Sequence, residues 1–151
     1  MTTADDQTEV KIRKAHYYEV RQITAFITPF VESGKLLPRT FDELDDLIDT
    51  LFVAEYNKAI VGVAALEIYS PKLAEVRSLA VDASMQGRGV GKGLVNACLK
   101  LARDKKVLEV MAITSSDAFF LSCGFDFTLP GEKKALFIQT RDVNSPDDTP
   151  Y

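Results

Sequence analysis

The chain has 151 residues, 46% hydrophobic and 26% charged, which is the length and composition of one folded domain. Its formal net charge of -4 excludes the broad basic surface that attracts nucleic acid or anionic lipid, so neither partner is expected. No apolar run approaches the roughly 20 residues that cross a bilayer, and no basic start precedes an apolar segment, so we expect a cytoplasmic protein. Cys98 and Cys123 lack CxxC spacing and clustered histidines, so we expect structural thiols and no metal site.

Hydrophobic periodicity predicts alternating strands and helices between two polar tails, residues 1–9 and 142–151. The expected elements in chain order are a strand over 10–15, helices over 16–34 and 36–51, a hairpin over 51–69, a strand over 73–82, a helix over 90–103, a strand over 107–114, a helix over 117–123, and two final strands over 125–129 and 133–141. This order, with a strand–loop–helix–strand unit at its centre, predicts one α/β domain over 10–141, built on a mixed central sheet flanked by helices.

Local signals mark several of these boundaries. Thr40 followed three residues later by Glu43 is the capping-box pattern that starts a helix. Asn57-Lys58 between two apolar runs predicts a tight hairpin turn. Pro29 is expected to bend the first helix near its end, and Gly124 to stop the last one.

The stretch "VDASMQGRGVGKGLV", residues 81–95, places four glycines and the cations Arg88 and Lys92 between a strand and a helix. Such a junction lets backbone amides approach a phosphate closely. It is not a P-loop, because Gln86 stands five positions before Gly91 and a glycine follows Lys92. It is not the dinucleotide fingerprint G-x-G-x-x-G either, whether counted from the first glycine or the second.

The pattern that fits is Q-x-x-G-x-G, formed by Gln86, Gly89 and Gly91. In its strand–loop–helix–strand context, and with "FFLSCGF" downstream, it resembles the acetyl-coenzyme A loop of the GNAT N-acetyltransferases. The resemblance implies acetyl-CoA as cosubstrate, with its pyrophosphate on the loop amides at a helix N-terminus. The implied cofactor-binding residues are Leu79, Ala80, Val81, Gln86, Gly87, Arg88, Gly89, Val90, Gly91, Lys92 and Gly93. The alternative is a glycine-rich turn that only packs a helix against a strand.

Three separated segments narrow the resemblance. "ESGKLLPRTFDEL", "LAEVRSLAV" and "AITSSDAFFLSCGF" are similar to the acetyltransferase domain of bacterial N-acetylglutamate synthases, and "EKKALFIQTRD" resembles the C-terminal strand of that family. Those enzymes acetylate the α-amine of glutamate at the start of arginine synthesis. They usually carry an amino-acid-kinase-like domain for which this chain has no room, so we expect a stand-alone form, with a homodimer compatible with the sequence.

The same resemblance nominates site residues. Glu75 matches a glutamate that deprotonates the amine, and the alternative is a surface carboxylate in a salt bridge. Many GNAT enzymes have a tyrosine as general acid where this chain has Phe120, which cannot donate a proton. The resemblance therefore implies that Ser116 donates a hydrogen bond to the leaving thiolate. The alternative is that Ser116 only caps the N-terminus of a helix. Arg39 aligns with a segment that holds the substrate carboxylates, with Arg77 and Arg141 as secondary contacts.

The sequence therefore predicts an N-acetyltransferase that moves acetyl from acetyl-CoA to the α-amine of glutamate or a related amino acid. Two alternatives remain. One is a GNAT enzyme with another acceptor, such as a polyamine, an antibiotic or a protein N-terminus. The other is a module that binds acetyl-CoA without catalysis.

Overall fold

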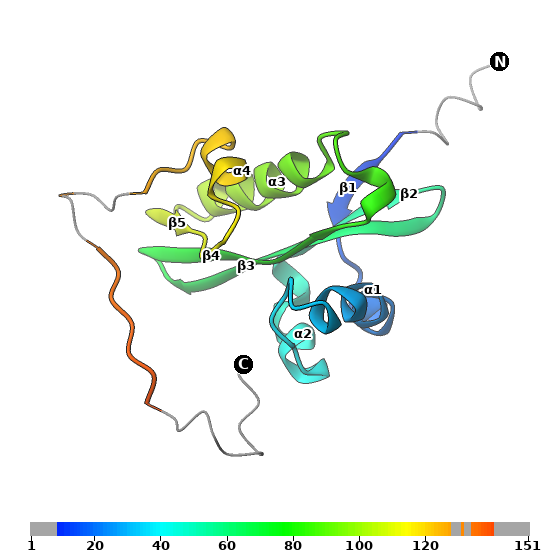
Figure 1. Ribbon diagram of the computed structural model, residues 1–151, viewed down its shortest axis with the longest axis horizontal. Helices are drawn as coiled ribbons and strands as arrows, with labels where there is room; N and C mark the ends of the chain where they lie inside the picture. Colours follow the sequence, from blue (N-terminus) through cyan, green and yellow to red (C-terminus); the bar gives the residue numbers. More distant parts are fainter. Residues whose placement is uncertain (1–8, 128–130, 132–133, 141–151) are drawn as a thin grey trace. The chain divides into compact units, whose positions relative to one another are not determined.

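The computed structural model describes residues 9–127, 131 and 134–140. The chain divides between Ile113 and Thr114 into two compact units. Figure 1 shows the first unit as a twisted sheet with helices on both faces. The second contains the short helix α4, Asp117–Ser122.

The sheet of the first unit has five strands in the order β1-β2-β3-β4-β5. Their bounds are Lys11–Lys14 for β1, Leu51–Tyr56 for β2, Ala59–Ser70 for β3, Leu73–Val81 for β4 and Glu109–Met111 for β5. Each of β1 to β4 is antiparallel to the next strand, whereas β5 is parallel to β4. The mixed sheet expected from the sequence is confirmed.

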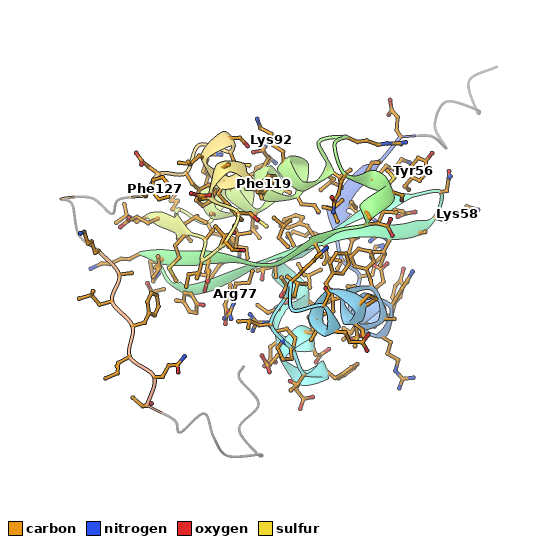
Figure 2. All side chains as sticks on the ribbon, viewed as in Figure 1. Tyr56, Lys58, Arg77, Lys92, Phe119 and Phe127 are labelled. Carbon is orange, nitrogen blue, oxygen red and sulfur yellow. The ribbon has the colours of Figure 1, made fainter. Side chains whose placement is uncertain are left out.

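Helices cover both faces of this sheet. On one face lie η1 (Tyr17–Glu19), α1 (Val20–Glu32), α2 (Phe41–Leu47) and η2 (Ile48–Thr50), and on the other lies α3 (Val90–Asp104), which follows the short η3 (Ala83–Met85). The fully buried Ile23 and Leu44 join Val53 and Val63 of the sheet in one core cluster, which holds α1 and α2 in place. Figure 2 shows Arg77 on this side of the sheet and Lys92 on the opposite side, on α3.

Two local predictions are confirmed in atomic detail. The Glu43 amide donates to Thr40 Oγ1 at 3.1 Å and the Thr40 amide donates to Glu43 Oε1 at 3.4 Å, which is the capping box that starts α2. Asn57 and Lys58 have φ values of 49° and 64°, the left-handed pair of a two-residue hairpin turn. In the second unit, Gly124 with φ of 96° follows the end of α4, as expected.

The strands expected late in the chain are wrong in part. The strand expected over 107–114 is formed only over Glu109–Met111. Residues 125–127 and 134–140 have no regular secondary structure, while 128–129, 133 and 141 lie outside the described residues. The short apolar run of "ALFIQ" suits a strand, but a strand exists only where its backbone pairs with a neighbour. Leu136 and Ile138 are instead 91% and 87% exposed.

Candidate active site

A β-bulge interrupts β4 at Ser78. Arg77 pairs with Ala65 and Ala80 pairs with Val63, so two residues of β4 stand opposite the single residue Ala64. Ser78 has a φ of 55°, which a residue with a side chain rarely adopts. Bulges bend a strand and redirect its side chains, and they are frequent beside functional sites.

Beyond the bulge, β4 has a free edge. The pairing with β5 covers only Leu73 to Glu75 of β4 and ends at the pair Glu75 and Met111, while β4 itself continues to Val81. Among the described residues, the backbone groups of this last part of β4 that face away from β3 have no strand partner. Leu79, Ala80 and Val81, which were nominated for the cofactor, lie on it. An edge of this kind can hydrogen-bond an extended ligand that carries amide groups.

The N-terminus of α3 follows this edge. Gly89 is its N-cap with φ of 78°, and the first intrahelical bond shown there runs from the Gly93 amide to the Gly89 carbonyl at 2.9 Å. The amides of Val90, Gly91 and Lys92 in the first turn therefore have no intrahelical acceptor, and the helix dipole adds roughly half a positive charge. The nominated Arg88 and Lys92 are exposed at the same end. These groups suit an anion such as a pyrophosphate.

Glycine is favoured at different positions of this loop for different structural reasons. Gly87 and Gly89 have φ values of 80° and 78°, which favour glycine whatever binds there. A Cβ on Gly93 would overlap Cδ1 of Ile12, so this glycine lets α3 pack closely on β1. The nominated Gln86 donates from Nε2 to the Val81 carbonyl at 3.3 Å, which links the start of the loop to the end of β4.

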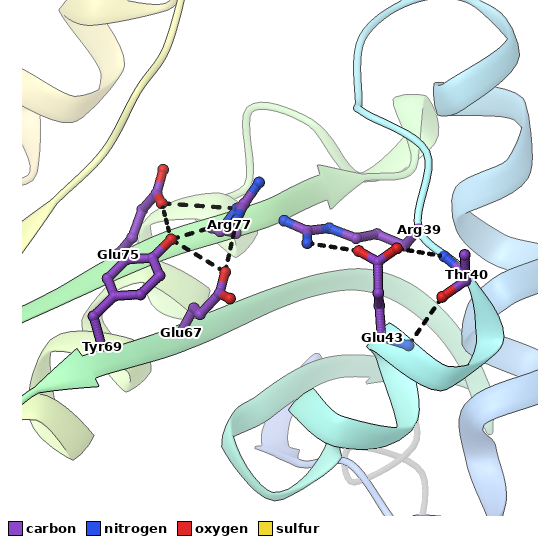
Figure 3. A network of polar contacts seen from close by, with 7 residues as sticks. All are labelled: Arg39, Thr40, Glu43, Glu67, Tyr69, Glu75 and Arg77. Atoms are coloured by element: carbon purple, nitrogen blue, oxygen red, sulfur yellow. Dashed lines mark hydrogen bonds and ion pairs between the residues drawn. The ribbon is translucent and has the colours of Figure 1, made fainter. Parts of the chain in front are cut away.

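Glu75 lies in a polar network on the α1 and α2 face of the sheet (Figure 3). Its side chain is 8% exposed, and its Oε1 accepts a hydrogen bond of 2.5 Å from the hydroxyl of Tyr69. Arg77 donates to Glu67 Oε2 at 2.7 Å and lies 3.8 Å from Glu75 Oε1. Arg77 therefore pairs chiefly with Glu67 rather than with Glu75, and Glu75 is too buried to be a surface carboxylate.

Arg39 points toward this network from the segment before α2 (Figure 3). Its side chain is only 8% exposed and donates to Glu43 Oε2 at 3.2 Å. A pocket of about 350 Å³ opens beside it, lined by Arg39, Glu43, Asp46, Leu47, Thr50, Glu67 and Ile68. Because Glu67 belongs to both groups, the pocket that Arg39 lines adjoins the network around Glu75.

Ser116 belongs to the second unit. It occupies the N-cap position of α4, but its hydroxyl makes no capping bond there. Its backbone amide donates to Thr114 Oγ1 at 2.8 Å. Phe120 is 8% exposed and makes edge-to-face contacts with Phe119 and Phe125, so it is a packing residue of this unit. Arg141, the remaining nominated residue, lies outside the described residues.

Tyr69 and Glu67 were not among the residues predicted from the sequence. Both lie on β3, and Glu67 is directly opposite Glu75 in the register. The register shifts between Ile68 and Ser70, so Tyr69 is an extra residue of β3 close to the Pro71-Lys72 connection, across which Ser70 pairs with Leu73. Counting back from that turn would place Ile68 opposite Glu75, so the turn did not reveal the pair. Asp46 of α2 gave no signal beyond that of an ordinary helical carboxylate.

Comparison with known proteins identifies the family. The profile described as "Acetyltransferase (GNAT) family" matches residues 17–125, which cross the boundary between the two units. The chain belongs to the GNAT acetyltransferase family. It is 33% identical over 119 residues to an amino-acid acetyltransferase of Mycobacterium tuberculosis, which covers 76% of this chain and 67% of that protein.

Solved structures of related GNAT proteins agree with this assignment. A crystal structure from Mycobacterium tuberculosis, in complex with CoA and NLQ, has a TM-score of 0.69 and 29% identity over 78% of this chain and 74% of that one. An N-acetylglutamate synthase from Neisseria gonorrhoeae, complexed with coenzyme A and N-acetyl-glutamate, has a TM-score of 0.68 and 28% identity over 76% of this chain. The match spans only 27% of that longer synthase.

The described part of this GNAT chain has neither a membrane-spanning helix nor a metal-binding cluster. None of its helices is both long and apolar enough to span a membrane. Within the same residues, no three histidine, cysteine, aspartate or glutamate side chains are grouped so that they could hold a metal ion.

Proposed function

We propose that this GNAT enzyme transfers acetyl from acetyl-CoA to the α-amine of an amino acid, with glutamate or a close relative as the acceptor. The observation that carries the proposal is the buried Arg39 in a pocket that adjoins the Glu75 network. A guanidinium and a carboxylate in neighbouring positions suit the two ends of an amino acid, its carboxylate and its amine. The amino-acid acetyltransferases among the relatives support this choice.

On the cofactor side, the first-turn amides of α3 would hold the pyrophosphate, with Arg88 and Lys92 beside it. The free edge of β4 over Leu79–Val81 would bind the amide groups of the pantetheine arm. Acetyl-CoA supplies the activated acetyl thioester when it is bound there. Figure 1 shows α3 and α2 on opposite faces of the sheet, and residues of α2 line the Arg39 pocket, so cofactor and acceptor would reach the bulge in β4 from different sides.

Glu75 would accept the proton that makes the acceptor amine nucleophilic, directly or through a water molecule. Backbone amides at the β4 bulge would stabilise the oxyanion. Ser116 would donate a hydrogen bond to the leaving thiolate, and its hydroxyl is not used for capping. A thiol with a pKa near 8.5 needs no strong acid to leave.

The charge of the pocket bears on the acceptor. Among the residues that the structure describes, Arg39 is the only cation that lines it, and three carboxylates also line it: Glu43, Asp46 and Glu67. Glutamate therefore needs Arg39 for one carboxylate and a further cation for the other, for which Arg77 and Arg141 are the candidates. A neutral relative such as glutamine meets less repulsion. With glutamate as acceptor, the enzyme would act in arginine synthesis in the cytoplasm.

A panel of amines tests the proposal. Acetyl-CoA turnover would be measured with glutamate, glutamine, aspartate, lysine, spermidine and a peptide N-terminus. Amino acids with a free α-carboxylate should be the best acceptors. Arg39→Ala should lower their kcat/KM by roughly 10- to 150-fold, because a charge-assisted pair contributes about 1.5–3 kcal/mol, and should leave acetyl-CoA affinity almost unchanged.

Exposed Arg21→Ala on α1 is the matched control and should behave as wild type. Preference for spermidine or for the peptide would replace the amino-acid assignment with another GNAT acceptor. Binding of acetyl-CoA without turnover of any amine would favour a module that binds without catalysis.

A further inference from the structure

The hydroxyl of Tyr69 lies between two carboxylates. It is 2.5 Å from Glu75 Oε1 and 3.2 Å from Glu67 Oε2, and it accepts a longer contact of 3.4 Å from Arg77 (Figure 3). A phenol has one proton to donate, so only one carboxylate can receive it at a time. The shorter distance gives that proton to Glu75. Glu67 has its own strong donor in Arg77 at 2.7 Å.

Tyr69 is a suitable permanent donor. Burial, together with the hydrogen bond to Glu75, raises the pKa of the Tyr69 phenol well above its ordinary value, so the phenol keeps its proton through the neutral range. The contact from Arg77 polarises the phenol oxygen further and strengthens its donation. A hydrogen bond from a neutral donor favours the charged form of the carboxylate that accepts it.

The contacts of Glu75 are not symmetrical. Within residues 9–127, both polar contacts of its side chain, to Tyr69 and to Arg77, involve Oε1. Oε2 therefore remains the oxygen that can meet an amine or a water molecule. A carboxylate with one oxygen held and the other open has a defined orientation and keeps its capacity to accept a proton.

We propose that Tyr69 is a positioning residue for acetyl transfer: its hydroxyl fixes Oε1 of Glu75 and directs Oε2 toward the acceptor amine. This inference rests on the proposed role of Glu75 as the base, whereas the hydrogen bond between Tyr69 and Glu75 does not. On the strands around Glu75, Glu67 of β3 lies opposite it, Met111 of β5 pairs with it, and Arg77 is two residues further along β4.

Tyr69→Phe removes the hydroxyl and keeps the ring. With acetyl-CoA saturating and the acceptor varied, kcat should fall by roughly 10-fold or more, because the hydrogen bond that orients the base is lost, while KM for the acceptor should change little. In a Glu75→Gln background, which lacks the base, the same Tyr69→Phe change should lower kcat no further.

Two further variants separate this effect from general damage. Glu67→Gln changes the longer contact of the Tyr69 hydroxyl and keeps the shorter one to Glu75, so it should lower kcat less than Tyr69→Phe does. Tyr17→Phe changes a tyrosine that is 80% exposed and should alter neither kcat nor KM.

The outcomes are distinct. An unchanged kcat in Tyr69→Phe would overturn the inference. A fall in kcat of the same size in the wild-type and Glu75→Gln backgrounds would also overturn it, because Tyr69 would then not act through Glu75. If Glu75→Gln by itself left kcat unchanged, Glu75 would be removed from catalysis, and with it the positioning role of Tyr69. A fall that disappears in the Glu75→Gln background supports the inference.

Discussion

The two buried carboxylates among the described residues, Glu19 and Glu75, show how the surroundings of a side chain decide its role. Both oxygens of Glu19 are bound, because Arg13 donates to them at 2.8 and 3.0 Å, and the His16 amide donates to Oε1 at 2.7 Å. Glu75 has one oxygen held by a neutral phenol and a more distant guanidinium. Glu19 is therefore a structural residue that joins β1 to η1, whereas Glu75 keeps an oxygen for chemistry.

Glu19 should make stability depend on acid pH. The hydrogen bonds from Arg13 hold the pKa of Glu19 below its usual range. Its contribution is thus complete above the unfolded-state pKa and is lost as pH falls through the lower folded-state pKa. Glu19→Gln should lower the free energy of unfolding by about 1–3 kcal/mol at pH 7, and the difference from wild type should shrink at acid pH.

Urea denaturation at several pH values measures this. Glu55→Gln is the matched control, since Glu55 also pairs with Arg13 at 2.8 Å but its side chain is 30% exposed, and it should cost less. If Glu19→Gln lowered the free energy of unfolding by the same amount at low pH as at pH 7, the stabilising role of the ionised Glu19 carboxylate would be contradicted.

At the residue scale, sequence reasoning found the site residues whose chemistry is visible from residue type and local motif. The side chains of Glu75 and Arg39 are each 8% exposed, and their roles as base and carboxylate ligand stay predictions. Tyr69 was not found, because its relation to Glu75 exists only across the register of β3 and β4. A contact that depends on strand pairing leaves no spacing pattern in the chain.

At the element scale, the packing of α3 on β1 explains a glycine that the sequence assigned to the cofactor. A helical glycine with free space around it should gain about 0.5–1 kcal/mol of stability on replacement by alanine. At Gly93 the new methyl would instead overlap Ile12 Cδ1. The sign of the change in the free energy of unfolding therefore shows whether the close contact between Gly93 and Ile12 is present.

Gly93→Ala should lower the free energy of unfolding by about 1–3 kcal/mol, since overpacking forces a side chain or helix to move. In an Ile12→Val background, which removes Cδ1, the same substitution should be neutral or stabilising. Urea denaturation of the four proteins in this cycle gives the coupling. A stable Gly93→Ala protein with weakened acetyl-CoA binding would instead show that the glycine serves the cofactor.

Elements with strong internal signals were predicted well, and those that depend on a neighbour were not. The N-cap of α2, the β2–β3 turn and the span of α3 follow from local chemistry. The strand over 107–114 was predicted too long, since β5 lasts only as far as its pairing with β4. The expected bend at Pro29, which lies inside α1, stays a prediction.

At the scale of the whole molecule, the net charge of -4 acts on the approach of the acceptor. It repels glutamate, whose two carboxylates and one ammonium leave a net negative charge, at long range, whereas the attraction of Arg39 acts only inside the pocket. Raising the ionic strength from about 0.01 to 0.1 M shortens the Debye length from about 30 to 10 Å, which screens the long-range field far more than a partly buried contact.

With acetyl-CoA kept saturating, kcat/KM for glutamate should therefore rise over this range of ionic strength. The value for glutamine should change little, because glutamine has no net charge at pH 7 on which the long-range field of the protein could act. Lysine serves as the opposite control: its net positive charge is attracted by the protein, so its kcat/KM should fall as salt is added. Initial rates at low acceptor concentration give kcat/KM directly for all three. A fall in the glutamate value would mean that cations around the pocket, rather than the net charge, govern the approach. Arg39→Ala would then identify whether Arg39 is the source, since its removal should abolish the fall.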